Sequence, residues 1–592
     1  MSRPSPHLLL RAPTPSQMSL TFCEANPREL RRWIAALPKA NIGEMARQLY
    51  QGMSELNQLI TLSENRLQLL ELLRPEVYFV CKHLERHFLN QAIVLDERAR
   101  KVANLCQALQ NQLAVGYKQI IVDIVPRLGK DRLQVLAVAT QRALHCLNGP
   151  LVRASLLYCP VPEGLWLELH QLYQIAREHR VQSTLVVDEL ALATRSMTPE
   201  QTYVCALLMG SSRCNQMRQS AILKLAEALE GWSSLAKIQP ASAASSLFAI
   251  APGLDGPPRY KTLFTEVQIA NLLGLDPQPL AAAIKAYLDL PAELRGESRL
   301  PMPNGISSDL LQLVAAAWGD VAERTFQRTP GQGTLTLCVG MSSLHYHLGG
   351  QRSFSDLLNR PTARAAEFGA LHAPDVWSHS FDAEKISSGY EEIQYNAPGP
   401  NGETGQGPGG AADFPTYVLQ IVNHSPGGYC LAWLKEVPPL LQAGEMVGIQ
   451  DAPSQGWSVA VVRWVRQVRS GGTQMGIELV APNAQPCGLQ LVRTNEPNSQ
   501  YLRGLLLPEI RAIDIPATLL APRLPFQEGN KVVINTNGDE SRAGLGKRLA
   551  STGSFNQFEY RAIEAVAEPD SAPEPADTAA PEDDFDSLWK DL

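Results

Sequence analysis

Two short groups of residues in this chain could bind a ligand. One is a pair of arginines, and the other is a turn rich in hydrogen-bonding groups. Arg324 and Arg328 stand four residues apart, just before a run of alternating apolar residues. Guanidinium forks suit phosphate oxygens and the O6/N7 edge of guanine, so this pair predicts a clamp for such a ligand. Further along the chain comes NHSPGG, where Asn423 offers an amide, Ser425 a hydroxyl and Gly428 a close backbone approach.

The arginine spacing has little specificity by itself. The same RxxxR spacing occurs at three other places: Arg28 and Arg32, Arg295 and Arg299, and Arg360 and Arg364. Only the pair at Arg324 and Arg328 directly precedes a predicted strand, so we favour it and keep Arg360 and Arg364 as the second candidate. The NxSxxG pattern is rarer by chance, and it follows a predicted strand.

The two groups, and the strands that follow them, resemble the PilZ domain family of bacterial cyclic di-GMP receptors. Three later stretches support the resemblance: GEMVG at 444–448, WSVAVVRW at 457–464 and GIEL at 476–479. The resemblance implies a six-stranded barrel in which Arg324 and Arg328 close over the phosphates and guanines of the ligand. It implies that Asn423, Ser425 and Gly428 hold another edge. The long insertion between the two motifs departs from the family pattern.

The elements expected to position these residues fall into several domains. Apolar residues at steps of three and four predict helices through most of the N-terminal half, and Asn26 and Pro27 form a typical N-cap and first helical position. We expect a multidomain fold: an N-terminal all-α helical bundle or stack of helical hairpins, an all-β PilZ-like six-stranded barrel with a long inserted loop, and a second small β unit. The expected boundaries are a disordered leader at 1–18, a helical module at 19–235, linker and connecting helices at 236–312, the barrel at 313–485 with a flexible insertion at 351–412, a C-terminal β unit at 486–566 and an acidic tail at 567–592.

The segment from Thr334 to Leu348 alternates like a strand over its whole length. This pattern puts His345 and His347 on one face of a strand. A metal site would need a third ligand nearby, and the sequence offers no obvious one, so ordinary strand histidines are the favoured interpretation. No P-loop, G-x-S-x-G elbow or H-E-x-x-H motif is present, so we expect no enzyme activity.

The composition restricts the compartment and the partners. The 592 residues carry 52 basic and 59 acidic side chains, a net charge of 52 − 59 = −7, so no chain-wide basic footprint for nucleic acid exists. Residues 568–592 contain nine acids and one lysine, −8 in net charge, which leaves the rest of the chain at −7 + 8 = +1. Ten scattered cysteines, no long apolar run and no signal peptide predict a cytoplasmic protein without membrane insertion.

The last ten residues contain one apolar helical face. Phe585, Leu588, Trp589 and Leu592 recur at i, i+3, i+4 and i+7, next to aspartates that favour a helix N-terminus. So short a helix needs a surface to form against. We favour docking to a protein partner, with packing on the chain's own helical module or no docking as the alternatives.

These observations predict a non-catalytic cyclic di-GMP effector without a cofactor. In this interpretation, ligand binding at the barrel changes the protein interactions of the helical module and the tail. The alternative is a degenerate PilZ scaffold that no longer binds nucleotide and acts as a protein-interaction adaptor.

Overall fold

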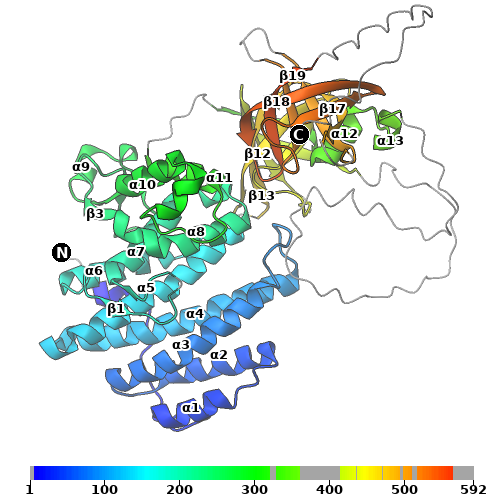
Figure 1. The fold of residues 1–592 in the computed structure, drawn as a ribbon. Helices are drawn as coiled ribbons and strands as arrows, with labels where there is room; N and C mark the ends of the chain where they lie inside the picture. Colours follow the sequence, from blue (N-terminus) through cyan, green and yellow to red (C-terminus); the bar gives the residue numbers. More distant parts are fainter. Residues whose placement is uncertain are drawn as a thin grey trace, which may run out of the picture.

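The computed structural model describes residues 6–191, 193–319, 328–359, 414–434, 437–469, 471–493, 498–509 and 516–563. Within these ranges a helical N-terminal region is followed by two closed six-stranded antiparallel barrels (Figure 1). The predicted fold class is therefore confirmed. Among the described residues, no helix combines the length and apolar composition that crossing a bilayer requires.

The N-terminal helices lie one beside the next, from α1 to α8 (Figure 1). Asn26 caps the first of them by accepting a hydrogen bond from the backbone N–H of Glu29, as its position before Pro27 predicts. The apolar faces of the helices meet in one continuous core that includes Leu49, Leu70 and Tyr117. The helices are α1 (Pro27–Ala35), α2 (Ile42–Gln58), α3 (Ser63–Glu85), α4 (Glu97–Ile124), α5 (Leu133–Leu156), α6 (Leu165–Glu178), α7 (Pro199–Ser211) and α8 (Gln219–Trp232).

The segment before α1 packs on this helical domain, so the prediction of a disordered leader is wrong for residues 6–18. Leu10 is buried, and Gln119 donates a side-chain hydrogen bond to the carbonyl oxygen of Pro13 at 2.9 Å. The backbone N–H groups of Ser16 and Gln17 both donate to the carbonyl oxygen of Gln58, at 2.8 and 2.7 Å. These contacts with distant helices could not be derived from the Pro/Ser-rich composition of the segment.

A buried ion cluster lies between α3, α5 and the loop before α7. The guanidinium of Arg74 donates to both carboxylate oxygens of Asp188, at 2.8 and 2.7 Å, and all of these groups are buried. Arg142 adds a second ion pair to Asp188 at 3.1 Å. Beside the cluster, His145 is partly buried and hydrogen-bonded to the hydroxyl of Tyr78 at 2.7 Å. Burial and the charge of Arg74 lower the pKa of His145 to about 4.

The low pKa of His145 predicts a loss of stability in acid. In the unfolded chain the pKa of His145 has its ordinary value of 6.5, and in the folded chain it is about 4. Between these two pH values the unfolded chain binds a proton on His145 that the folded chain does not bind. The contribution is present above pH 6.5, is lost as the pH falls toward 4, and amounts to about 3 kcal/mol at most. Thermal melts across this range should show a smaller acid-induced fall in Tm for His145→Gln than for wild type. The exposed control His87→Gln should follow the wild-type curve; a His145→Gln curve that also follows it would contradict the prediction.

The region expected to be linker and connecting helices, 236–312, contains a four-stranded sheet as well. The order in the sheet is β3-β6-β4-β5, and Phe248 of β4 stacks on Tyr260 of β5. Its strands are too short for their alternation to be recognised in a sequence rich in Ala, Ser, Pro and Gly. The elements are β3 (Lys237–Pro240), β4 (Phe248–Ile250), β5 (Arg259–Tyr260), α9 (Glu266–Ile269), β6 (Leu273–Asp276), α10 (Gln278–Asp289) and α11 (Ser308–Gly319).

The first barrel follows the order β10-β13-β12-β11-β8-β9, and pairing of β9 with β10 closes it. A two-residue strand, β7 (Thr329–Pro330), pairs with the outer end of β9. Leu337, Leu431 and Val462 are among the side chains that fill its core. The barrel strands are β8 (Thr334–Val339), β9 (Thr416–Ser425), β10 (Gly428–Trp433), β11 (Met446–Gln450), β12 (Ser458–Gln467) and β13 (Thr473–Ala481).

The predicted strand from Thr334 to Leu348 is wrong in its second half. The strand ends at Val339, and α12 (Met341–Leu348) follows after Gly340, whose φ of +89° favours glycine. His345 is buried and donates to the carbonyl oxygen of Cys487, and His347 stacks on Trp457. Within the described parts of the chain, no three His, Cys, Asp or Glu side chains are grouped as a metal site requires.

The second barrel has its own core and the ring order β14-β15-β16-β19-β18-β17. Phe526 and Phe558 are the largest side chains fully buried there. Its strands are β14 (Gln485–Leu491), β15 (Leu502–Leu507), β16 (Thr518–Pro522), β17 (Lys531–Thr536), β18 (Asp539–Ser551) and β19 (Phe555–Ala562).

The first residues of the predicted flexible insertion pack on this second barrel. Residues 351–359 include the short helix α13 (Phe354–Leu357), and both Leu357 and Leu358 are buried. Asn535 of β17 donates to the carbonyl oxygen of Leu358 at 3.4 Å. The prediction of a flexible loop is therefore wrong for 351–359, while 360–413 lies outside the described residues.

Two loop replacements should separate these parts of the insertion. Replacing 351–412 with a short Gly/Ser linker removes the two buried leucines, so Tm should fall by several degrees, because each lost leucine costs about 2–5 kcal/mol. Replacing only 360–413 should leave Tm within a few degrees of wild type. Equal Tm values for the two replacements would show that the contacts of Leu357 and Leu358 contribute no stability.

The β12–β13 hairpin docks the first barrel onto the helical domain. The backbone N–H of Gln467 donates to the carbonyl oxygen of Tyr158 at 2.7 Å. Its side-chain amide donates to the carbonyl oxygens of Ile93 and Leu157, at 2.8 and 3.1 Å. A second contact joins Arg218 of the helical domain to Glu445 of the barrel at 3.2 Å.

Candidate ligand-binding site

Strand pairing brings one of the predicted arginines to the NxSxxG turn. In the β7–β9 ladder, Thr329 pairs with His424 and Pro330 with Asn423. Arg328, one residue before Thr329, therefore lies at the end of β9 beside Ser425. Its side chain is exposed, and among the described residues it has no ion-pair partner.

Gly428 begins β10, and its position requires a glycine. It pairs with Ser425 on one side and with Glu478 of β13 on the other. A Cβ at this position would collide with the backbone carbonyl oxygen of Ile477. The Ser425 hydroxyl donates to the Gly428 carbonyl oxygen at 3.4 Å, which helps to hold the turn. The glycine thus allows the β9–β10 hairpin to approach β13.

The structure brings together four of the five predicted ligand-binding residues: Arg328, Asn423, Ser425 and Gly428. Arg324 lies outside the described residues, as do the second-candidate arginines Arg360 and Arg364. The predicted docking residues of the tail also lie outside them: Phe585, Leu588, Trp589 and Leu592.

A row of paired residues extends the site across the outer face of the barrel. Asn423 pairs with Cys430, Cys430 with Gly476, and Gly476 with Trp464. Directly paired residues point to the same side of a sheet, so Asn423 and Trp464 share a face. The indole of Trp464 covers Gly476 so closely that any Cβ there would collide with it.

Arg466 completes this face. Its guanidinium lies 5.3 Å from the centre of the Trp464 ring and donates to the side-chain oxygen of Gln474 at 2.8 Å. Burial raises the pKa of the Cys430 thiol, and the charges of Arg328 and Arg466 oppose that rise. By strand pairing, Arg328 lies at the Asn423 end of the row and Arg466 at the Trp464 end. Sequence reasoning missed Trp464 and Arg466 as site residues, because their alternation in β12 shows only that they share one face of that strand.

The chemistry of this face is that of binding. Two guanidinium groups can reach phosphate oxygens or base edges, and one indole offers a flat surface for a base. The amide of Asn423 and the hydroxyl of Ser425 add hydrogen bonds. The described residues of this face include no nucleophile held by a general base.

A closed six-stranded barrel with an arginine beside an NxSxxG hairpin defines a PilZ domain. Comparison with known proteins gives the same result: a family model described as the middle PilZ domain of the cyclic-di-GMP receptor FimW matches residues 247–486. Models of the N-terminal domain and the C-terminal β-barrel domain of FimW match 28–243 and 487–563. The chain belongs to the FimW family.

The full length of the chain supports this assignment. It is 58% identical over 608 aligned residues to the cyclic-di-GMP receptor FimW of Pseudomonas aeruginosa, and the alignment covers 100% of both chains. No solved structure matches the chain.

Proposed function

We propose that this protein is a non-catalytic cyclic di-GMP receptor whose ligand lies on the outer face of the first barrel. The observation that carries the proposal is the β7–β9 pairing, which places Arg328 beside Ser425. The name of the P. aeruginosa relative supports the ligand.

In this proposal each group has a distinct role. Arg328 donates to a phosphate or to the O6/N7 edge of a guanine, and Arg324, four residues earlier in the sequence, supplies the second fork. Trp464 stacks on a guanine, and Arg466 lies beside its ring. Asn423 and Ser425 bind a further polar edge of the ligand.

The proposal also covers the location of the protein and its protein contacts. We place the protein in the cytoplasm. Ligand binding at the barrel changes the protein contacts of the helical module and of the C-terminal tail. The β12–β13 hairpin supports the first of these links, because Arg466 on the ligand face is followed directly by Gln467, which contacts the helical domain.

Calorimetry with the full chain tests the ligand and the placement of the site. Cyclic di-GMP should bind saturably, and GMP much more weakly because it offers one base and one phosphate. Trp464→Ala should reduce affinity by about tenfold, since stacking of one base contributes about 1–3 kcal/mol. The control Trp33→Ala, in the helical domain, should bind as wild type does. Absence of binding by wild type would favour a degenerate PilZ scaffold that acts only as an adaptor.

A further inference from the structure

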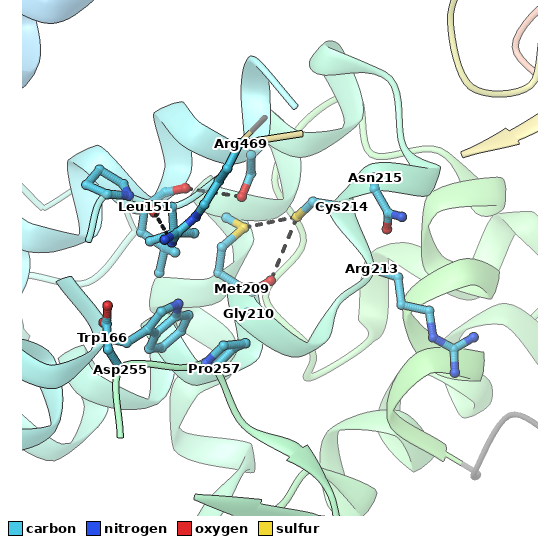
Figure 2. Close-up of a pocket in the computed structure, with 13 residues that line it drawn as sticks. Leu151, Trp166, Met209, Gly210, Arg213, Cys214, Asn215, Asp255, Pro257 and Arg469 are labelled. Atoms are coloured by element: carbon cyan, nitrogen blue, oxygen red, sulfur yellow. Dashed lines mark hydrogen bonds between the residues drawn. The ribbon is translucent and has the colours of Figure 1, made fainter. Parts of the chain in front are cut away.

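A cavity lies between the helical domain and the β12–β13 hairpin, away from the face that contains Arg328. Its volume is about 340 Å³. Helices α5, α6 and α7, the turn after α7 and the loop after β4 form most of its wall, and Arg469 of the hairpin reaches in from the barrel (Figure 2). Typical small-molecule pockets have volumes of about 300–1,000 Å³, so this cavity suits a small ligand.

The floor of the cavity is apolar and built around one indole. Trp166, Met209 and Pro257 lie together there in Figure 2. A Cβ at Gly210 would come within 2.6 Å of the Trp166 ring, so the glycine makes room for the indole. A flat, apolar body of a ligand could lie against this surface.

Several hydrogen-bond donors of the cavity lack acceptors. The indole nitrogen of Trp166 points into the space in Figure 2, and the described residues give its N–H no hydrogen bond. Among the residues that the structure describes, Arg469 makes one hydrogen bond, a long one of 3.5 Å to the carbonyl oxygen of Val161. The side-chain amide of Asn215 also has no partner in the described part of the chain.

The other two charged residues of the wall are already engaged. The carboxylate of Asp255 accepts from the backbone N–H groups of Gly164 and Leu167, at 2.7 and 3.3 Å, at the N-terminus of α6. The N-terminus of α6 has a positive electrostatic potential, which stabilises the negative charge of Asp255. Arg213 hydrogen-bonds the hydroxyl of Tyr260 and lies 5.9 Å from the centre of its ring. The groups left for a ligand are therefore donors, and one of them is a cation.

We propose that this cavity binds a small aromatic anion. The ring lies on Met209 and Pro257, and the carboxylate or phosphate accepts from Trp166 and Arg469. Because Arg469 belongs to the barrel and Trp166 to the helical domain, the ligand bridges the two. This site shares no residue with the proposed cyclic di-GMP site, and its existence does not depend on that proposal.

Indole N–H resonances of the full chain, labelled with ¹⁵N-tryptophan, provide the test. Trp166→Phe identifies the Trp166 signal among the nine tryptophans. Benzoate and phenyl phosphate are the probes, and benzyl alcohol is the neutral control. We expect at least one anion to shift the Trp166 signal saturably at millimolar concentration, and benzyl alcohol to leave it unchanged. Whichever anion binds more tightly identifies the ligand as a carboxylate or a phosphate ester.

Two arginine variants test whether Arg469 is the cation that binds the anion. Arg469→Ala should weaken binding by about tenfold or more, because hydrogen bonds to charged groups contribute about 1.5–3 kcal/mol. Arg463→Ala, on the same hairpin but paired with Glu478, should bind as wild type does. An unchanged Trp166 signal with both anions, equal binding by benzyl alcohol, or equal binding by Arg469→Ala would each overturn the proposal. Cyclic di-GMP binding by Arg469→Ala, measured in parallel, reports separately on the other site.

Discussion

Replacing Arg328 with alanine should weaken cyclic di-GMP binding by about tenfold or more, because each hydrogen bond to a charged group contributes about 1.5–3 kcal/mol. The side chain is exposed and has no ion-pair partner among the described residues, so its removal should leave Tm nearly unchanged. Calorimetry gives the affinity, and a thermal melt of the same sample confirms the fold. A loss of affinity without a loss of stability is the signature of a ligand contact.

Two further variants control for the choice of arginine. Arg561→Ala removes an exposed arginine from β19 of the second barrel and should leave the affinity unchanged. Arg364→Ala examines the second RxxxR pair. If Arg364→Ala weakens binding while Arg328→Ala does not, the ligand uses the other pair and our assignment of the site is wrong.

Replacing Asp188 with alanine should lower the free energy of unfolding of the helical domain by about 3–5 kcal/mol, the cost of breaking a buried ion pair. The change leaves the guanidinium groups of Arg74 and Arg142 facing each other in the core without the shared carboxylate. Urea unfolding followed by circular dichroism, which is dominated by the helices, measures the effect.

An exposed aspartate is the matched control for this second prediction. Asp131→Ala removes a carboxylate near the start of α5 that is exposed, so the stability should stay within about 0.5 kcal/mol of wild type. Equal stabilities of Asp188→Ala and Asp131→Ala would show that the buried cluster contributes nothing to the fold. The thermal melts of His145→Gln at falling pH, described above, examine the same cluster in acid.

The barrel and its turn could be predicted because their signals are local. Alternation of apolar and polar residues predicts β9 and β12. The residues from Asn423 to Gly428 all lie in one hairpin, so their spacing is a local signal. The structure adds the reason for Gly428, which is the close approach of Ile477. The tryptophan and the second arginine of the face, Trp464 and Arg466, could not be assigned, because only pairing across four strands places them beside Asn423.

The wrong predictions share a physical cause. The leader at 6–18 and the segment at 351–359 have compositions typical of loops, yet both are held by contacts with residues far away in the sequence. The alternation from Thr334 to Leu348 suits a strand, yet Gly340 turns the chain and α12 packs between the two barrels. Long-range packing decided the structure in these places, and local pattern could not reveal it.

The contacts of Gln467 have a consequence for how the sequence can diverge. All three hydrogen bonds that Gln467 donates to the helical domain end on backbone carbonyl oxygens, those of Tyr158, Ile93 and Leu157. A carbonyl oxygen is present whatever side chain its residue carries. Positions 93 and 157 can therefore change without loss of these bonds, as long as the backbone keeps its path, whereas position 467 must keep an amide. At this domain junction, selection should therefore constrain position 467 of the barrel more strongly than positions 93 and 157 of the helical domain.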